Sequence, residues 1–378
     1  MPHPGYTPPL VTTLLLVALY ATACTSAATP DVAPTRGATG SAPANTAPAA
    51  RGKIAILLPE AKTARYESHD MPDFKSKLQA LGFDVTNNLI YSNANQDAAA
   101  QQSQAEAALT NGARVLVLDP VDSAAAAAVA DMAAAVGVPV ISYDRLITGT
   151  SAVRYYISFD NEQVGRLQAQ SLLTALRGKP NPTVVMINGS PTDHNATLYK
   201  QGAHAVLDDH VTIAQEYDTP AWSPDQAQNE MTQALTALSN HVDGVLAAND
   251  GTAGGAIAAM KAAGLTLLPP VTGQDAELVA IQRILAGEQY MTVYKAIKAE
   301  AEVAATLAYD LFADTPVPAN IFNSTVSNGA ILVPSVLLVP VAVTRANVET
   351  TIIADGFWRA ADICTDEFVQ ACAAAGVQ

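Results

Sequence analysis

The feature that most constrains the fold of this chain is a regular alternation of short apolar runs with longer amphipathic or alanine-rich runs. The apolar runs have the length of strands and include residues 53–59, 114–120, 139–145, 183–191 and 245–248. The runs between them have the length of helices, and several end at a glycine such as Gly82 or Gly137. Strict alternation of strands and helices predicts parallel sheets with helices on both faces. Two sets of such units in 378 residues predict an α/β protein of two doubly wound lobes.

Polar side chains recur at one position of this pattern, at the ends of the apolar runs and in the loops that follow them. They are Asp119, Asp144, Arg145, Asp193, Asn195, Asn249, Asp250, Gln274 and Asp275. Open parallel sheets bind ligands in the crevice outside the carboxyl ends of their strands, so we expect these residues to converge on one cleft. Carboxylates accept hydrogen bonds from hydroxyl groups, while guanidinium and amide groups donate to hydroxyl oxygens. Such a cleft suits a polyhydroxylated ligand.

The N-terminal segment has a different composition from the rest of the chain. Residues 10–23 form an apolar stretch shorter than the about 20 residues of a membrane span, and ATAC, ending at Cys24, resembles a bacterial lipobox. Ala21 stands where that motif usually has leucine. We expect residues 1–24 to be a signal peptide with lipidation at Cys24; a plain secretory signal is the alternative. Residues 25–51, rich in Ala, Pro and Thr, are expected to be a flexible tether.

Charge and motifs exclude several function classes. The net charge of −15 is spread along the chain, which argues against a nucleic-acid-binding surface. The sequence has no G-x-S-x-G elbow, Walker A loop, H-E-x-x-H helix or G-x-G-x-x-G loop, so we expect no cofactor and no metal. The glycines of GTAGG after Asp250 are interpreted as close helix packing. In an exported protein, Cys364 and Cys372 favour a disulfide, with two unpaired thiols as the alternative.

Five long segments resemble the periplasmic xylose-binding proteins. They are ISYDRLI (141–147), YISFDNEQVGRLQA (156–169), NGSPTDHNATLYKQG (188–202), AANDGTAGGAI (247–257) and GQDAELVAIQRILAGEQYMTVYKAI (273–297). That family, with the related multiple-sugar-binding proteins, supplies the solute-binding components of ABC transporters. The resemblance runs from about Lys53 to Trp358. It implies the type I periplasmic binding protein fold, in which two Rossmann-like lobes are joined by a three-segment hinge.

The resemblance also implies lobe boundaries. We expect residues 52–150 and 292–318 to form the N-terminal lobe, and residues 151–291 and 319–378 to form the C-terminal lobe. The chain would cross between them near residues 148–156, 288–294 and 315–328.

Ligand contacts follow from the same resemblance, position by position. Arg65 matches the family's arginine, and Tyr66 stands where a tryptophan is usual. The other residues that match contact positions are Asp144, Arg145, Asp193, Asn195, Trp222, Asn249, Asp275 and Lys295. Asp250 and Gln274 are interpreted as loop support. Asp119, which the family does not use, is interpreted as a loop cap.

The function implied by the resemblance is capture of a monosaccharide, D-xylose or a related aldopyranose, by hinge closure. The protein would be a monomeric lipoprotein on the outer face of the cell membrane, held there through its lipid anchor alone, and would deliver the sugar to an ABC transporter permease. One alternative is a sugar receptor that presents its ligand to a chemosensory or regulatory partner. Another is a sugar-processing enzyme that uses Asp144, Asp193 or Asp275 as acid or base.

Overall fold

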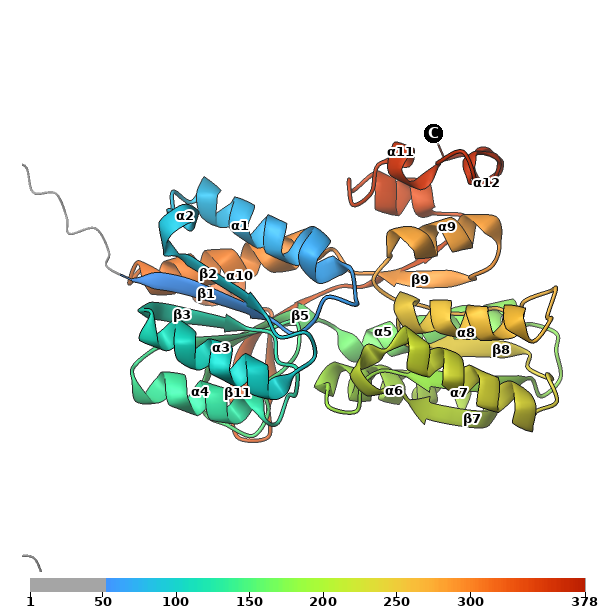
Figure 1. Cartoon of the computed structure of the whole chain (residues 1–378), viewed down its shortest axis with the longest axis horizontal. Coiled ribbons are helices and arrows are strands. Elements are labelled where there is room, and N and C mark those ends of the chain that lie inside the picture. Colours follow the sequence, from blue (N-terminus) through green and yellow to red (C-terminus); the bar gives the residue numbers. More distant parts are fainter. Residues whose placement is uncertain (1–51, 378) are drawn as a thin grey trace, which may run out of the picture. The chain divides into compact units, whose positions relative to one another are not determined.

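A computed structural model describes residues 52–377, and within them strands and helices alternate as the sequence pattern predicts (Figure 1). The strands are β1 Lys53–Leu58, β2 Leu89–Asn93, β3 Ala113–Leu118, β4 Val140–Tyr143, β5 Val153–Phe159, β6 Thr183–Asn188, β7 Thr212–Asp218, β8 Gly244–Ala247, β9 Met291–Tyr294, β10 Ser324–Ser327, β11 Leu332–Leu338 and β12 Val341–Thr344. The predicted α/β fold is confirmed. The expected signal peptide (1–24), Cys24 and the tether (25–51) lie outside the described residues.

The helices fill the intervals between the strands. The α-helices are α1 Met71–Ala80, α2 Val85–Asn88, α3 Ala98–Thr110, α4 Ala126–Ala135, α5 Asn161–Ala175, α6 His194–Leu207, α7 Pro224–Ala237, α8 Asp250–Ala262, α9 Leu278–Ala286, α10 Ile297–Phe312, α11 Ala360–Ile363 and α12 Val369–Ala375. Short turns of π- or 3₁₀-helix are η1 Tyr66–Asp70, η2 Pro220–Trp222, η3 Ala319–Ile321 and η4 Glu349–Ile353.

The first sheet has seven strands in the order β10-β11-β5-β4-β3-β1-β2, parallel except for the β10–β11 pair. Side chains of β1 alternate between its faces: Ile54, Ile56 and Leu58 pack with α1 and α10. Ala55 and Leu57 pack with α3 and α4, on the other side of the sheet (Figure 1). A strand covered on both faces needs a continuous apolar run, and IAILL supplies it.

The second sheet repeats this arrangement on three parallel strands, in the order β7-β6-β8. In β6, Val185 and Ile187 pack with α7 and α8, whereas Val184 and Met186 pack with α5 and α6. Strands β9 and β12 form a separate antiparallel pair. The helix α9 packs with η4, α11 and α12 in a further apolar cluster beside this pair.

The sheet pairings differ from the expected lobe boundaries. Strand β5 and the hairpin β10–β11, expected in the C-terminal lobe, hydrogen-bond into the first sheet, because β5 pairs with β4 and β11 pairs with β5. Helix α5 then begins at Asn161 and contacts β8, β9 and β12. The chain therefore leaves the first sheet at Asp160. It returns between β9 and α10, and it leaves again between β11 and β12.

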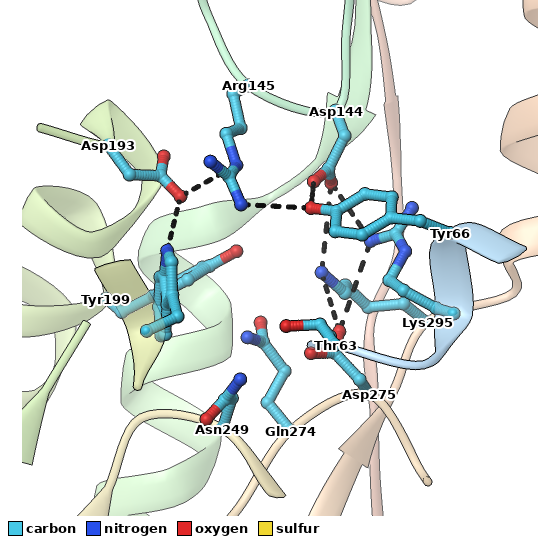
Figure 2. A pocket seen from close by; sticks show the side chains of 12 residues that line it. Thr63, Tyr66, Asp144, Arg145, Asp193, Tyr199, Asn249, Gln274, Asp275 and Lys295 are labelled. Atoms are coloured by element: carbon cyan, nitrogen blue, oxygen red, sulfur yellow. Dashed lines mark hydrogen bonds and ion pairs between the residues drawn. The ribbon is translucent and has the colours of Figure 1, made fainter. Parts of the chain in front are cut away.

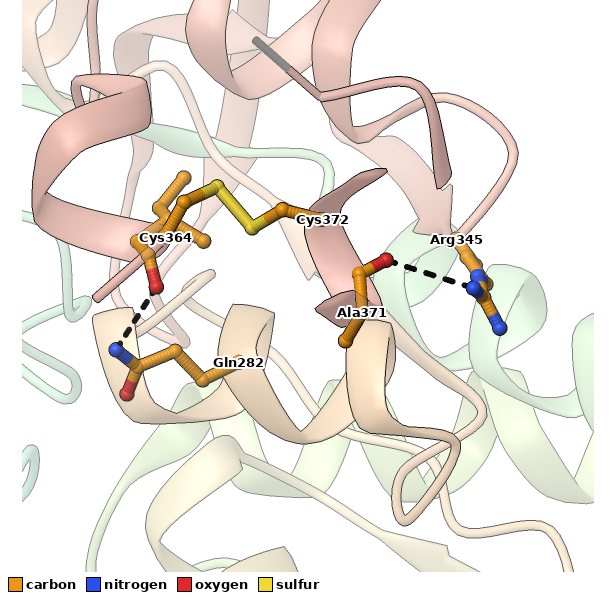
Figure 3. The surroundings of a disulfide bond; sticks show 6 residues. Gln282, Arg345, Cys364, Ala371 and Cys372 are labelled. Atoms are coloured by element: carbon orange, nitrogen blue, oxygen red, sulfur yellow. Dashed lines mark hydrogen bonds between the residues drawn. A yellow bond between two sulfur atoms is a disulfide. The ribbon is translucent and has the colours of Figure 1, made fainter. Parts of the chain in front are cut away.

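The two cysteines of the C-terminal segment, Cys364 and Cys372, form a disulfide (Figure 3). The amide of Gln282, on α9, donates a hydrogen bond of 3.1 Å to the carbonyl oxygen of Ile363. The disulfide and this bond hold α11 and α12 beside α9.

The glycine-rich stretch of α8 lies against α7. A Cβ atom at Gly255 would lie 2.2 Å from the carbonyl oxygen of Pro224, closer than any real Cβ contact. The two helices therefore approach backbone to backbone at this point. The interpretation of GTAGG as helix packing is confirmed.

Candidate functional site

A cavity with about 250 Å³ of unfilled space lies beside the carboxyl ends of strands from both sheets (Figure 2). The residues that line it are Thr63, Arg65, Tyr66, Asp144, Arg145, Asp193, Tyr199, Trp222, Asn249, Gln274, Asp275 and Lys295. Strands β4 and β9 end directly before Asp144 and Lys295, and β8 ends two residues before Asn249, which explains why residues far apart in sequence meet here.

The cavity gathers all of the sequence-predicted contact residues except Asn195. The Nδ2 atom of Asn195 donates to the carbonyl oxygen of Asp144 at 2.9 Å. Its Oδ1 accepts from Nδ2 of Asn161 at 2.9 Å. Asn195 therefore ties the start of α6 to the turn after β4. Three lining residues, Thr63, Tyr199 and Gln274, were not among the predicted contacts.

Arg65 is held by a set of buried carboxylates. Its Nε and Nη2 donate to the two oxygens of Asp70 at 2.9 and 2.7 Å, and Nη2 also donates to Glu300 at 2.7 Å. Its Nη1 remains for Asp144, at 3.1 Å. Neither Asp70 nor Glu300 was identified from the sequence as a support of Arg65. No motif could have indicated Glu300, because it lies 235 positions from Arg65.

Asp144, Lys295 and Asp275 form an ion-pair chain beside this arginine. The Nζ atom of Lys295 lies 3.0 Å from Asp275 and 3.8 Å from Asp144. Burial alone would raise the pKa of Asp144, but the charges of Arg65, Lys295 and Arg145 outweigh it and hold that pKa at about 2. Burial lowers the pKa of Lys295, and its two carboxylate partners more than restore it. Asp144 and Lys295 are therefore both charged at neutral pH.

Tyr66 stands between two guanidinium groups. The Arg65 guanidinium lies 5.2 Å from its ring centre, and that of Arg145 lies at 5.8 Å. Its hydroxyl donates to Asp144 at 3.3 Å and accepts from Arg145 at 3.2 Å. A tryptophan at this position would offer no hydroxyl for this bridge.

The opposite wall is built on Asp193, at the N-cap of α6. One oxygen accepts from the backbone N–H of Asn195 at 2.8 Å, and so caps the helix. The other oxygen lies 3.0 Å from Nε of Arg145 and accepts from the indole N–H of Trp222 at 3.1 Å. Burial raises the pKa of Asp193. These contacts fix the orientation of Trp222 as well as that of the arginine.

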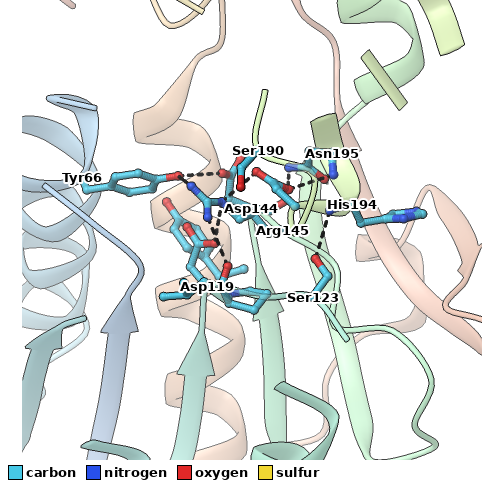
Figure 4. Close-up of polar contacts among 12 residues, drawn as sticks. Tyr66, Asp119, Ser123, Asp144, Arg145, Ser190, His194 and Asn195 are labelled. Carbon is cyan, nitrogen blue, oxygen red and sulfur yellow. Dashed lines mark hydrogen bonds and ion pairs between the residues drawn. The ribbon is translucent and has the colours of Figure 1, made fainter. Parts of the chain in front are cut away.

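The interpretation of Asp119 as a loop cap is wrong. Its side chain is fully buried, and neither oxygen has a hydrogen-bond partner within residues 52–377. Its charged neighbour is Arg145, whose Nε lies 3.6 Å away (Figure 4). Burial raises the pKa of this carboxyl well above its ordinary value. Arg145 thus lies between carboxylates that follow strands of the first and the second sheet.

The two polar residues after β8 have different tasks. The Oδ1 atom of Asn249 accepts from the backbone N–H of Thr252 and caps α8, which leaves its Nδ2 at the cavity. Asp250 is fully buried behind the cavity and accepts hydrogen bonds from Gln289 at 2.7 Å and from the Thr292 hydroxyl at 2.9 Å. The interpretation of Asp250 as loop support is confirmed.

Three lining residues have left-handed backbone conformations. The φ angles are 51° at Asp144, 53° at Trp222 and 90° at Asp275. Aspartate tolerates this region better than most residues, whereas it is rare for a bulky side chain such as tryptophan. Such conformations persist only where the surrounding structure enforces them, and they cluster at ligand sites.

The stability of the protein should depend on pH through Asp250. Burial raises the pKa of this carboxyl to about 7, so the folded state keeps a proton that the unfolded state loses near pH 4. The contribution of Asp250 to the free energy of unfolding should therefore fall as the pH rises from about 4 to 7 and stay constant above pH 7. The size of this fall is about 1.4 kcal/mol for each unit by which the pKa is shifted. Urea denaturation at several pH values in this range should show that the free energy of unfolding falls less steeply with pH for Asp250→Asn than for the unmodified protein. An equal dependence on pH in the two proteins would contradict the raised pKa of Asp250.

The lining groups match a neutral, hydroxyl-rich ligand. Arg65, Arg145 and Lys295 are balanced by Asp144, Asp193 and Asp275. Carboxylates accept hydrogen bonds from hydroxyl groups, a lysine donates to hydroxyl oxygens, and amides can do both. An aromatic face can cover the C–H surface of a sugar ring. No group of three or more His, Cys, Asp or Glu is placed to hold a metal ion within residues 52–377.

Comparisons with known proteins agree with this geometry. The model of the periplasmic binding protein domain family matches residues 54–315. The D-xylose-binding periplasmic protein of Haemophilus influenzae is 38% identical over 310 residues, covering 81% of this chain and 90% of the relative. The multiple sugar-binding periplasmic receptor ChvE of Rhizobium radiobacter is 34% identical, covering 82% and 92%. An ABC transporter solute-binding protein from Clostridium phytofermentans with bound β-D-glucose aligns with a TM-score of 0.76 at 28% identity, covering 82% and 99%.

Proposed function

Because this chain belongs to the periplasmic binding protein family, we propose that it is the sugar-binding component of an ABC transporter, with D-xylose or a related aldopyranose as its ligand. As a member of a family of binding proteins it is not an enzyme. It would hold one monosaccharide and deliver it unchanged to a permease.

The observation that carries this proposal is the charge-balanced cavity at the strand ends. Its hydrogen-bonding groups come from both sheets: Asp144 and Arg145 follow a strand of the first, and Asn249 follows a strand of the second. We propose as direct ligand contacts the lining residues Arg65, Tyr66, Asp144, Arg145, Asp193, Trp222, Asn249, Gln274, Asp275 and Lys295. Gln274 is included because its Oε1 is buried without a hydrogen-bond partner in the described part of the chain.

The sheet pairings support a hinge. We propose that the chain crosses between two lobes at Asp160, at residues 295–296 and at residues 339–340, the three points where it passes from one set of paired strands to the other. Binding proteins close around their ligands by such hinge motions. Closure would be driven by the higher affinity of the closed state for the sugar.

The proposal extends to the cellular location. We propose export, lipidation at Cys24 and attachment to the outer face of the membrane, with the folded part acting as a monomer. Among residues 52–377, no helix has the length and apolar character needed to cross a membrane. Under this proposal the anchor is the lipid on Cys24.

A second candidate, a sugar receptor, is favoured by one relative, which is described as a periplasmic receptor. It would use the same cavity and differ only in the protein that recognises the bound form. Co-purification with the cognate permease, compared with and without sugar, separates the two roles.

A thermal-shift panel tests the proposed ligand class. D-xylose, D-ribose, D-glucose, D-galactose and myo-inositol would each be added to the purified protein. A ligand at 100 times its dissociation constant adds about 2.7 kcal/mol to the free energy of unfolding, which is readily detected. We expect the largest shift with an aldopyranose. No shift with any monosaccharide would contradict the proposal.

A further inference from the structure

Tyr199 presents a polar group to the cavity that none of the interactions described above uses. The residue lies on α6 and is only 3% exposed, yet its side chain lines the cavity. Figure 2 shows its hydroxyl directed into the cavity. That hydroxyl has no hydrogen bond to another side chain or to the backbone within the described part of the chain. Because Tyr199 lines the cavity, a ligand bound there can supply a partner for this hydroxyl.

The ring of Tyr199 is held firmly enough to position that hydroxyl. It packs against the indole of Trp222 with ring centres 6.3 Å apart and an interplanar angle of 61°. Its backbone lies so close to α5 that a Cβ atom at Gly165 would stand 1.9 Å from the Tyr199 carbonyl oxygen. A fixed hydroxyl can discriminate between ligands, because little conformational entropy is lost when it forms a hydrogen bond.

The electrostatic surroundings fix the protonation state of this hydroxyl. Burial raises the pKa of Tyr199 well above its ordinary value, and the charges of Asp144, Asp193 and Asp275 raise it further. The side chain is therefore a neutral phenol at physiological pH, able both to donate and to accept a hydrogen bond. A sugar hydroxyl offers the same two functions and is a suitable partner.

We propose that Tyr199 is a specificity-determining ligand contact whose hydroxyl forms a hydrogen bond with one hydroxyl group of the bound pyranose. This inference rests on the proposed sugar-binding function. It adds to the ion-paired residues a neutral group that recognises the position of one hydroxyl. A sugar lacking that hydroxyl leaves the phenol unpaired and binds more weakly.

The test combines a conservative variant with altered ligands. Tyr199→Phe removes only the hydroxyl and keeps the ring that packs on Trp222. Tyr217→Phe is the matched control, because its hydroxyl contacts Gln215 on β7 and does not line the cavity. Calorimetric titrations would use D-xylose, or D-glucose if that binds more tightly, and the monodeoxy analogues of the same sugar.

The proposal predicts that Tyr199→Phe weakens binding of the parent sugar by about two- to tenfold, the range expected for loss of one neutral hydrogen bond. For one monodeoxy analogue, the effects of the substitution and of the missing hydroxyl should be clearly non-additive. Tyr217→Phe should bind as the unmodified protein does. If Tyr199→Phe binds the parent sugar with unchanged affinity, this inference alone is overturned. The same holds if the substitution lowers the affinity for the parent sugar and for every analogue by the same factor. Absence of monosaccharide binding to the unmodified protein would overturn the proposed function with it.

Discussion

Replacing Asp275 with alanine is expected to weaken monosaccharide binding by about 100-fold or more. Asp275 is 4% exposed, and its Oδ1 has no hydrogen-bond partner within residues 52–377, although Lys295 Nζ lies 3.0 Å away. Its loss removes a charged acceptor for a sugar hydroxyl. It also leaves Lys295 with Asp144 as its remaining ion-pair partner, at 3.8 Å. Truncating one partner of a buried, hydrogen-bonded charge pair at a binding interface costs about 2–5 kcal/mol of affinity, and about 2.8 kcal/mol corresponds to 100-fold.

The control for this substitution is Asp225→Ala, the same change at an exposed position in the first turn of α7. It should bind sugar with the affinity of the unmodified protein. Circular dichroism without ligand should show that the Asp275→Ala variant is folded. Normal sugar affinity in a folded Asp275→Ala protein would remove this residue from the proposed contact set.

Replacing Gly165 with alanine is expected to lower the free energy of unfolding by about 3 kcal/mol or more. The added Cβ would lie 1.9 Å from the carbonyl oxygen of Tyr199 and 2.9 Å from the backbone nitrogen of Ala203. Backbone atoms cannot move aside as the end of a flexible side chain can, so α5 and α6 must separate. Since α6 carries Asp193 at its N-cap and Tyr199 six residues further on, sugar binding should weaken as well.

Gly251→Ala is the matched control, because it adds the same methyl group to a helical glycine. The nearest heavy atom to a Cβ at Gly251 is 3.5 Å away, an ordinary contact distance. The free energy of unfolding should change by less than about 1 kcal/mol, in the direction that helix propensity favours. Urea denaturation of both variants measures the difference. Similar stabilities for the two would contradict the close α5–α6 approach.

Much of the fold follows from sequence because its strands are buried on both faces. Such strands leave continuous apolar runs like IAILL in β1, which are easily recognised. Strand β5 was not predicted, because Arg154 and Ser158 interrupt its apolar run. Arg154 is exposed, while Ser158 is buried and donates to the carbonyl oxygen of Asp144. Only the pairing of β5 with β4 and β11, which the sequence does not specify, makes this segment a strand.

The residues of the cavity also divide into those that the sequence indicates and those that it does not. Asp144 and Asn249 could be chosen because each directly follows an apolar run, and strand ends of a parallel sheet converge. Arg65, Trp222 and Lys295 needed the family resemblance. Glu300 could not be found by either route, because its contact with Arg65 depends on how α10 packs beside η1.

Tyr199 and Asp119 illustrate what sequence alone leaves open. Tyr199 lies in the middle of a helix, where an aromatic residue is usually part of the core. Asp119 occupies a strand end like Asp144, yet it is fully buried and faces Arg145. The difference between the two aspartates lies in which side chains surround them, and that is a property of tertiary packing.

Isothermal titration of D-xylose into the purified protein tests directly whether this cavity binds a sugar. We expect saturable binding of one sugar per chain, with at least about 100-fold weaker binding by Asp275→Ala and unchanged binding by Asp225→Ala. Titrations with D-ribose and D-glucose would rank the related aldopyranoses. Absence of binding to all three sugars, or equal binding by Asp275→Ala, would contradict the assignment of this cavity as a sugar-binding site.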